Sequence, residues 1–296
     1  MTPGASRNER NFHGQRCVEI VLPQGDRALI SLFGAQVLSW QPAGFSEQFY
    51  LSPRREMNSS TAIRGGVPIC FPQFNQRVLD GLRLPKHGFA RTEVWTPQQP
   101  MSTETFAEAG FVLSSISQTS AEWPHDFSAT VTVRLEPGRL RTHFAVRNTG
   151  PSTWRFALAL HTYLAVNDVN DTQLHGLGGC RYWDTVEDLH KPHSRREQAP
   201  GPLFFAGETD RIYTGAEAPL ELRSTGGSLR ITQSASMPDT VVWNPGAVLC
   251  ATISDMPPDG WKNMVCVEAA RIHDPQRLTA GESWSGWQQL ECIPRV

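Results

Sequence analysis

Residues 128–147 read SATVTVRL-EPGR-LRTHFAVR, and this stretch decides the fold class. Apolar and polar side chains alternate on both sides of a Pro-Gly turn, which is the pattern of an antiparallel hairpin with one face in water. Similar strand-like runs occur along the rest of the chain, at residues 28–33, 36–40, 111–117, 155–166, 228–233, 240–243, 248–253 and 264–270. Gly, Pro, Asn and Asp clusters separate them, and an amphipathic helix of ordinary length is absent. We predict an all-β protein, a large antiparallel β-sandwich with few short helices.

The length of 296 residues suits one large all-β domain. A composition break or a Ser/Gly linker is missing, so we expect a single domain over residues 1–296, with 1–12 as a loosely ordered N-terminal extension. Residues 176–201 form a polar, charged stretch. This stretch is either an excursion over a binding face or a solvated loop.

The formal net charge is only −2, which argues against a nucleic-acid-binding groove. The first ten residues lack the apolar core of a signal peptide, and no stretch is long enough to span a bilayer. The six cysteines are scattered without a CxxC pair, so a disulfide framework is not expected. Cys70, Cys250 and Cys266 lie in apolar runs, and we expect them to be buried free thiols. We expect a cytoplasmic monomer without nucleic-acid or membrane partners.

A basic region lies around RGGVPICFPQF (64–74) and LPKHGFAR (84–91). Gly, Pro and aromatic residues here suit a packed, irregular wall. Arg64 and Arg91 could hold a planar, multiply charged oxygen ligand such as a phosphate, with Lys86 and His87 beside them. The alternative is that both arginines are surface residues around a buried turn.

The strand around His161 has two distinct faces. One face is large and apolar, and the other carries small residues followed by an imidazole and a phenol. The apolar face consists of Trp154, Phe156, Leu158, Leu160 and Thr162. The other face consists of Arg155, Ala157, Ala159, His161 and Tyr163. Small side chains leave room above a sheet, so His161 is either on the floor of a cleft or a satisfied histidine in a polar layer.

Glu268 interrupts MVCVEAA (264–270), a run that otherwise suits a buried strand. Burying an ionised carboxylate is costly unless it is paired. Glu268 therefore needs a partner, such as His161 or an arginine. It is either a general base in a pocket or half of a structural ion pair with Arg271 or another base. Sequence spacing alone does not say whether Glu268 and His161 meet.

Several motifs together resemble a known family. The matching blocks are RGGVP through FPQF (64–74), LPKHGFAR (84–91), LHTYL (160–164), DM through WKNMVCVEA (255–269), ETDRIY (208–213) and VWNP (242–245). They occur in the expected order through nearly the whole chain. The chain is similar to the hexose-6-phosphate mutarotases (glucose-6-phosphate 1-epimerases) of the aldose 1-epimerase superfamily.

The resemblance implies a galactose mutarotase-like sandwich with a site over one concave sheet. It implies that His161 is the general acid and Glu268 the general base. Substrate-binding roles are implied for Arg64, Arg91, Lys86 and Asp210, with His87 in a secondary role. Two positions depart from the family: Lys86 stands where Gln is common, and Gly246 stands where a bulky aromatic is common.

The implied reaction interconverts the α and β anomers of a hexose 6-phosphate by acid/base ring opening and reclosure. A carboxylate close to His161 should favour the protonated imidazole. We expect no cofactor. We also expect no metal, since His87, His161 and Glu268 are not at the close sequence spacing typical of metal ligands. Three other functions stay open: an epimerase for unphosphorylated aldoses, a non-catalytic carbohydrate-binding or sensing protein, and a glycoside-cleaving enzyme that uses Asp210 with Glu268.

Overall fold

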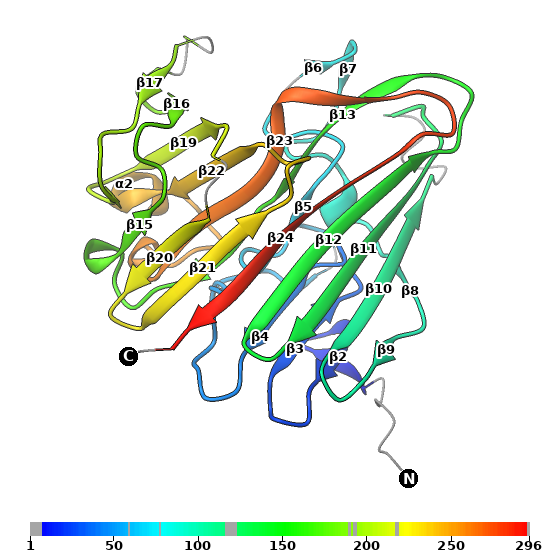
Figure 1. The fold of residues 1–296 in the computed structure, drawn as a ribbon. Helices are drawn as coiled ribbons and strands as arrows, with labels where there is room; N and C mark the ends of the chain where they lie inside the picture. The colour runs from blue at the N-terminus through cyan, green and yellow to red at the C-terminus, as the bar shows by residue number, and fades with distance from the viewer. Residues whose placement is uncertain are drawn as a thin grey trace.

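The computed structural model describes residues 8–58, 60–76, 78–115, 123–188, 191, 194–216 and 219–294. Two large sheets dominate this part of the chain (Figure 1). Neighbouring strands within both large sheets run antiparallel. The all-β antiparallel prediction is confirmed.

The larger sheet has ten strands in the order β18-β15-β20-β21-β24-β12-β11-β10-β8, with β9 also paired to β10. Its strands are β8 (Thr96–Pro97), β9 (Met101–Ser102), β10 (Ala107–Ser114), β11 (Phe127–Glu136), β12 (Arg139–Asn148), β15 (Gln173–His175), β18 (Leu203–Phe204), β20 (Leu220–Ser224), β21 (Gly227–Gln233) and β24 (Ser283–Ile293).

The second sheet has eight strands in the order β17-β16-β19-β22-β23-β13-β5, with β14 also paired to β23. Its strands are β5 (Ile69–Cys70), β13 (Trp154–Leu160), β14 (Tyr163–Ala165), β16 (Arg181–Asp184), β17 (Arg196–Glu197), β19 (Thr209–Thr214), β22 (Asp239–Asn244) and β23 (Met264–Leu278).

Two small sheets and a few short helices complete the described part. The small sheets are β1 (Asn8–Phe12), β2 (Gln15–Val21), β3 (Arg27–Ser31) and β4 (Val37–Gln41) in one, and β6 (Val78–Leu79) and β7 (Leu82–Arg83) in the other. The helices are η1 (Ala90–Thr92), η2 (Val169–Asp171), α2 (Gly246–Cys250) and η3 (Gly260–Asn263). Among the described residues, none of these helices has the length and apolar character needed to cross a membrane.

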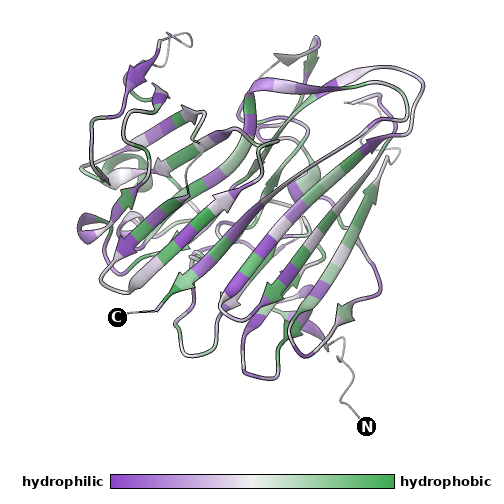
Figure 2. Cartoon of the chain, viewed as in Figure 1, coloured by the Kyte–Doolittle hydropathy of each residue, from purple (hydrophilic) through white to green (hydrophobic). Residues whose placement is uncertain are grey.

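The hairpin that decided the fold class is β11–β12, with Leu135 opposite Leu140 across the turn. Burial alternates residue by residue along both strands, and Figure 2 shows the corresponding alternation of hydropathy. The buried side, which includes Val131 and Phe144, belongs to one apolar cluster with Phe156 of β13 and Val267 of β23. The two large sheets therefore pack face to face with the main core between them.

The eight-stranded sheet uses its two faces differently. Leu158 and Leu160 point into the main core, whereas Ala157 and Ala159 belong to a separate cluster on the opposite face. Thr162 also points inward, where its hydroxyl donates to Gln288 Oε1 at 2.5 Å. The two-face interpretation of this strand is confirmed, with a bulge between Phe156 and Leu158.

Three local predictions differ from the structure. Residues 248–253, expected as a strand, instead hold most of α2 and the turns after it, because the chain turns sharply at Gly246, whose φ is +60°. Residues 176–201, expected as a loop, contain β16 and β17, which extend the eight-stranded sheet. Asn8–Phe12 pair with β2 as strand β1 rather than extending loosely, and residues 1–7 lie outside the described residues.

Candidate active site

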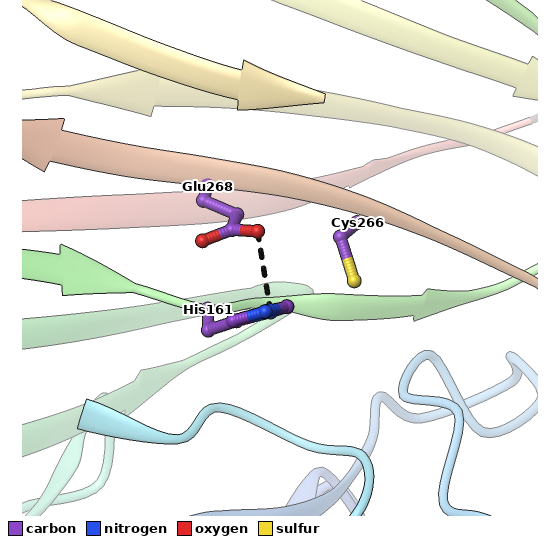
Figure 3. Close-up of side chains that lie close together, drawn as sticks. All are labelled: His161, Cys266 and Glu268. Atoms are coloured by element: carbon purple, nitrogen blue, oxygen red, sulfur yellow. Dashed lines mark ion pairs between the residues drawn. The ribbon is translucent and has the colours of Figure 1, made fainter. Parts of the chain in front are cut away.

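His161 and Glu268 meet on the face of the eight-stranded sheet that points away from the main core. Leu160 pairs with Ala269 on one side of them, and Tyr163 pairs with Cys266 on the other, in the same register. This register places His161 opposite Glu268. His161 Nδ1 lies 3.2 Å from Glu268 Oε1, as the dashed line in Figure 3 shows.

A second row of side chains crosses the sheet next to this pair. Asp210 on β19 pairs with Trp243 on β22, which pairs with Cys266 on β23, which pairs with Tyr163 on β14. Because paired residues of neighbouring strands share a face, all four side chains lie on the side of Glu268. Sheet register therefore assembles residues that are far apart in sequence.

Aromatic rings hold the imidazole of His161 from several directions. The Tyr163 ring stacks on it with centroids 4.8 Å apart and an interplanar angle of 9°. Trp243 and His87 meet it edge to face, with centroids 6.0 and 5.5 Å away. His161 is 8% exposed and Glu268 is 0% exposed, so the site lies deep while solvent still reaches the imidazole.

The glycine-rich wall at residues 64–74 runs beside the histidine strand. His161 N–H donates to Pro68 O at 3.0 Å, and Tyr163 N–H donates to Gly66 O at 2.9 Å. Gly66 has φ +60°, and a Cβ there would lie 2.0 Å from Val37 O. Only glycine permits this conformation at so close an approach, which explains the Gly-Gly pair in the sequence.

Arg64 is held by two partners within the site. Its Nε donates to both carboxylate oxygens of Asp255 at 3.1 Å, and Nη1 donates to the Tyr163 hydroxyl at 3.1 Å. Asp255 comes from the turn between α2 and η3. An Asp255–Arg64–Tyr163 chain therefore fixes the ring that stacks on His161.

Arg91, Lys86 and His87 stand together at the edge of the site. Arg91 Nη2 donates to Lys86 O at 2.6 Å, and its buried Nε has no hydrogen-bond partner among the described residues. Lys86 is exposed, whereas His87 is buried with φ +65° and accepts at Nδ1 from Asn75 N–H at 3.3 Å. Arg91 and Lys86 therefore place positive charge at the solvent side of the imidazoles.

Burial shifts the acid–base properties of the central pair in opposite senses. It raises the pKa of Glu268 well above its usual value, and the nearby Asp210 charge adds to that effect. It lowers the pKa of His161 well below its usual value, and the positive charges of Arg64 and Arg91 lower it further. The structure does not support the expectation that the carboxylate favours protonated His161, because burial and then the charges of Arg64 and Arg91 lower the pKa of the imidazole.

Asp210 is partly exposed at the end of the second row. Burial raises its pKa to about 6, against a hydrogen bond with Thr185 that lowers it. Gly246 borders this end of the site, and a Cβ there would lie 2.6 Å from Glu208 N. This position leaves no room for a bulky aromatic side chain.

Two residues of the site were missed by sequence reasoning. The sequence places Cys266 in an apolar run, and its spacing of two residues from Glu268 puts both side chains on the same face. Asp255 belongs only to a family motif at the level of sequence. Its contact with Arg64 joins distant segments, so no local pattern could reveal it. The structure places the other candidate residues together in this region of the molecule. They are His161, Glu268, Arg64, Arg91, Lys86, His87 and Asp210.

The fold and site define a galactose mutarotase-like protein. A crystal structure from Salmonella typhimurium described as a "putative mutarotase" superposes with a TM-score of 0.88 and 30% identity, covering 100% of this chain and 95% of that one. The sequence profile of the aldose 1-epimerase family matches residues 16–291. This chain belongs to the aldose 1-epimerase family, and it is an isomerase of the mutarotase type acting on a sugar.

Two relatives carry a more specific name, "Putative glucose-6-phosphate 1-epimerase". The protein from Cenchrus ciliaris is 31% identical over 290 residues, which covers 94% of this chain and 85% of the relative. The protein from Escherichia coli (strain K12) is 34% identical over 260 residues, which covers 86% and 82% respectively.

Proposed function

We propose that this chain interconverts the α and β anomers of hexose 6-phosphates, as a glucose-6-phosphate 1-epimerase. The observation that carries the proposal is the 3.2 Å approach of His161 and Glu268 on a sheet face where Arg64 and Arg91 supply positive charge. The names of the relatives from Cenchrus ciliaris and Escherichia coli point to the same substrate.

The chemistry needs one proton acceptor and one proton donor. A cyclic aldose opens when the anomeric hydroxyl loses a proton and the ring oxygen gains one. Glu268 takes the first proton and His161 gives the second. After rotation about the C1–C2 bond, closure on the other face reverses both transfers. The protein returns to its starting state, so the cycle is balanced without a redox cofactor.

This assignment requires the mobile proton of the pair to rest on His161 when the sugar is bound. Burial and the arginine charges oppose that state by lowering the pKa of His161. A bound phosphate dianion offsets the charges of Arg64, Arg91 and Lys86, which removes part of this opposition. The phosphate therefore prepares the acid as well as anchoring the sugar.

Arg91 and Lys86 are the main phosphate-binding groups in this proposal. Arg91 Nε is free of hydrogen-bond partners among the described residues, and Lys86 is exposed beside it. Charge-assisted hydrogen bonds from a guanidinium to phosphate oxygens are directional and strong. The second positive charge of Lys86 adds to the attraction without fixing the geometry.

Arg64 has a different task, because Asp255 and the Tyr163 hydroxyl already hold it. Each terminal nitrogen of a guanidinium carries a second N–H, so Arg64 can still donate to a sugar oxygen. Asp210 accepts from sugar hydroxyls at the other end of the site, and His87 holds the edge of the imidazole. Arg64 thus links substrate binding to the position of Tyr163.

The test compares Arg91→Ala with the wild type on two sugars, by following anomer exchange with NMR. The KM for glucose 6-phosphate should rise by about 10- to 100-fold, which is the worth of a charged hydrogen bond, while rates with glucose change little. Arg139→Ala serves as the control, because Arg139 is an exposed arginine paired with Glu291 on the ten-stranded sheet.

Two outcomes would count against the proposal. Equal losses for both sugars in Arg91→Ala would remove the phosphate from the assignment and favour an epimerase for unphosphorylated aldoses. Failure of the wild type to speed the exchange of any hexose 6-phosphate would refute the proposed reaction.

A further inference from the structure

His161, Cys266 and Glu268 form a compact group with three different donor atoms. A ring nitrogen, the thiol sulfur and a carboxylate oxygen all lie within 4.8 Å of one another, and all three residues are buried (Figure 3). Cys266 and Glu268 project from the same face of β23, and His161 faces them from the neighbouring strand segment. The arrangement is held by sheet register rather than by a surface loop.

Three side-chain atoms of this group have no hydrogen-bond partner in the part of the chain that the structure describes. Among the described residues, neither carboxylate oxygen of Glu268 nor Nδ1 of His161 makes a hydrogen bond, since their 3.2 Å approach lacks hydrogen-bond geometry. Buried polar atoms are seldom left unsatisfied, so these atoms call for a ligand that accepts lone pairs. A sugar hydroxyl can satisfy the oxygens and the nitrogen, but it offers little to the thiol of Cys266.

We propose that His161, Cys266 and Glu268 bind one thiophilic divalent cation of the Zn²⁺ or Cd²⁺ class, which competes with the sugar for the site. A set of one nitrogen, one sulfur and one oxygen suits such ions, whereas Mg²⁺ and Ca²⁺ prefer all-oxygen ligands. Three protein ligands leave a fourth tetrahedral position for water or a sugar oxygen.

The distances fit after a modest adjustment. Zinc bonds of 2.0–2.3 Å place tetrahedral ligand atoms roughly 3.3–3.8 Å apart. The nitrogen and oxygen of His161 and Glu268 already stand 3.2 Å apart. No two of the three ligand atoms lie more than 4.8 Å apart, so closing the widest gap takes a movement of at most about 1 Å. Rotation of the Cys266 side chain can supply this movement.

Binding is a proton-releasing coordination step. The Cys266 sulfur loses its thiol proton to solvent and forms the metal–sulfur bond as a thiolate, and Glu268 binds as a carboxylate, releasing any proton it carries. His161 binds through a neutral ring nitrogen. The oxidation states of metal and sulfur do not change.

The consequence for catalysis rests on the proposed function. A metal ion on His161 and Glu268 occupies both proton-transfer groups, so one bound ion per chain should abolish anomer exchange. The binding itself is measured separately from activity, so the two proposals can fail independently.

The experiment titrates the full-length protein with Cd²⁺ and follows the thiolate-to-cadmium charge-transfer absorption in the ultraviolet. One equivalent should bind to the wild type and to Cys70→Ser, a control that alters an equally buried thiol on strand β5, which pairs with β13. Cys266→Ser should lose the absorption and bind Cd²⁺ at least about 100-fold more weakly. Saturating glucose 6-phosphate should displace the ion from the wild type.

Several results would overturn the site. Absorption that persists in Cys266→Ser, or that disappears in Cys70→Ser, would place the ion elsewhere. Calorimetry on the metal-free protein first establishes that the sugar phosphate binds. If Cd²⁺ then stays bound in the presence of saturating sugar phosphate, the ion occupies a different site. If Cys266→Ser does not fold, X-ray absorption spectroscopy of the zinc-loaded wild type replaces it. The zinc ion should have one sulfur and at least two nitrogen or oxygen neighbours. Any other number of sulfur neighbours would refute the site.

Discussion

Replacing Glu268 by Gln should stabilise the protein while it removes most of the activity. The carboxyl group is 0% exposed, and its two oxygens have no hydrogen-bond partner among the described residues. Burial and the charge of Asp210 raise its pKa. The neutral amide of Gln has the same shape but does not ionise, so it avoids the free-energy cost of a buried carboxylate charge.

The size of the effect follows from these contacts. While the raised pKa keeps the carboxyl group protonated, the wild type loses about 1.4 kcal/mol of stability for each pH unit above the usual pKa of glutamate, and Gln avoids this loss. The gain is therefore about 1–3 kcal/mol between about pH 5 and pH 6.5. For a chain of this length, that gain corresponds to a rise in Tm of roughly 2–6 °C. Loss of Glu268 as the general base proposed above should reduce kcat by about 10²- to 10⁴-fold.

The stabilisation should depend on pH with a defined sign. The folded-state pKa of Glu268 is raised above its unfolded value, so the wild type loses stability as pH rises above about 4.3, the usual value for glutamate. The Gln variant does not titrate at this position. The difference between the two proteins should therefore be small at acidic pH and should grow toward neutral pH.

Thermal unfolding at several pH values, with anomer exchange measured in parallel, checks this prediction. Asp239→Asn is the matched control, because this buried carboxylate accepts from the N–H groups of Ile272 and His273 at 2.7 and 2.8 Å. Losing those charge-assisted bonds should destabilise the protein by about 1–3 kcal/mol. A Glu268→Gln variant that is less stable than the wild type at every pH would refute the reasoning.

Three further predictions concern the support of the site. Asp255→Asn should free Arg64 and loosen Tyr163, lowering kcat by about tenfold while Tm falls by only a few degrees, as stopped-flow polarimetry and calorimetry can show. Gly66→Ala should destabilise the fold by about 2–4 kcal/mol in urea unfolding, because its methyl group would lie 2.0 Å from a backbone oxygen. Since the pKa of Asp210 is about 6, its protonation should raise KM below that pH, and Asp210→Asn should show a high KM without this acidic limb.

Local patterns predicted much of the fold. The alternation in residues 128–147 matched β11 and β12, because side chains on successive strand residues point to opposite faces whatever the neighbours are. The same rule separated Leu160 from His161 correctly. The strand prediction for residues 248–253 is wrong, because a short apolar run fits a buried strand as well as a helical turn. The positive φ of Gly246, where the chain turns, does not follow from the sequence.

The chemical groups of this site are evident from the residues alone: an imidazole, a carboxylate and several cations, set in strands that can bury one face. Only the tertiary structure decided that His161 and Glu268 meet, that Cys266 joins them and that Asp255 holds Arg64. Strand periodicity is a local property of the chain. Register between distant strands depends on how whole sheets pack, and this register brings His161 and Glu268 within 3.2 Å of each other.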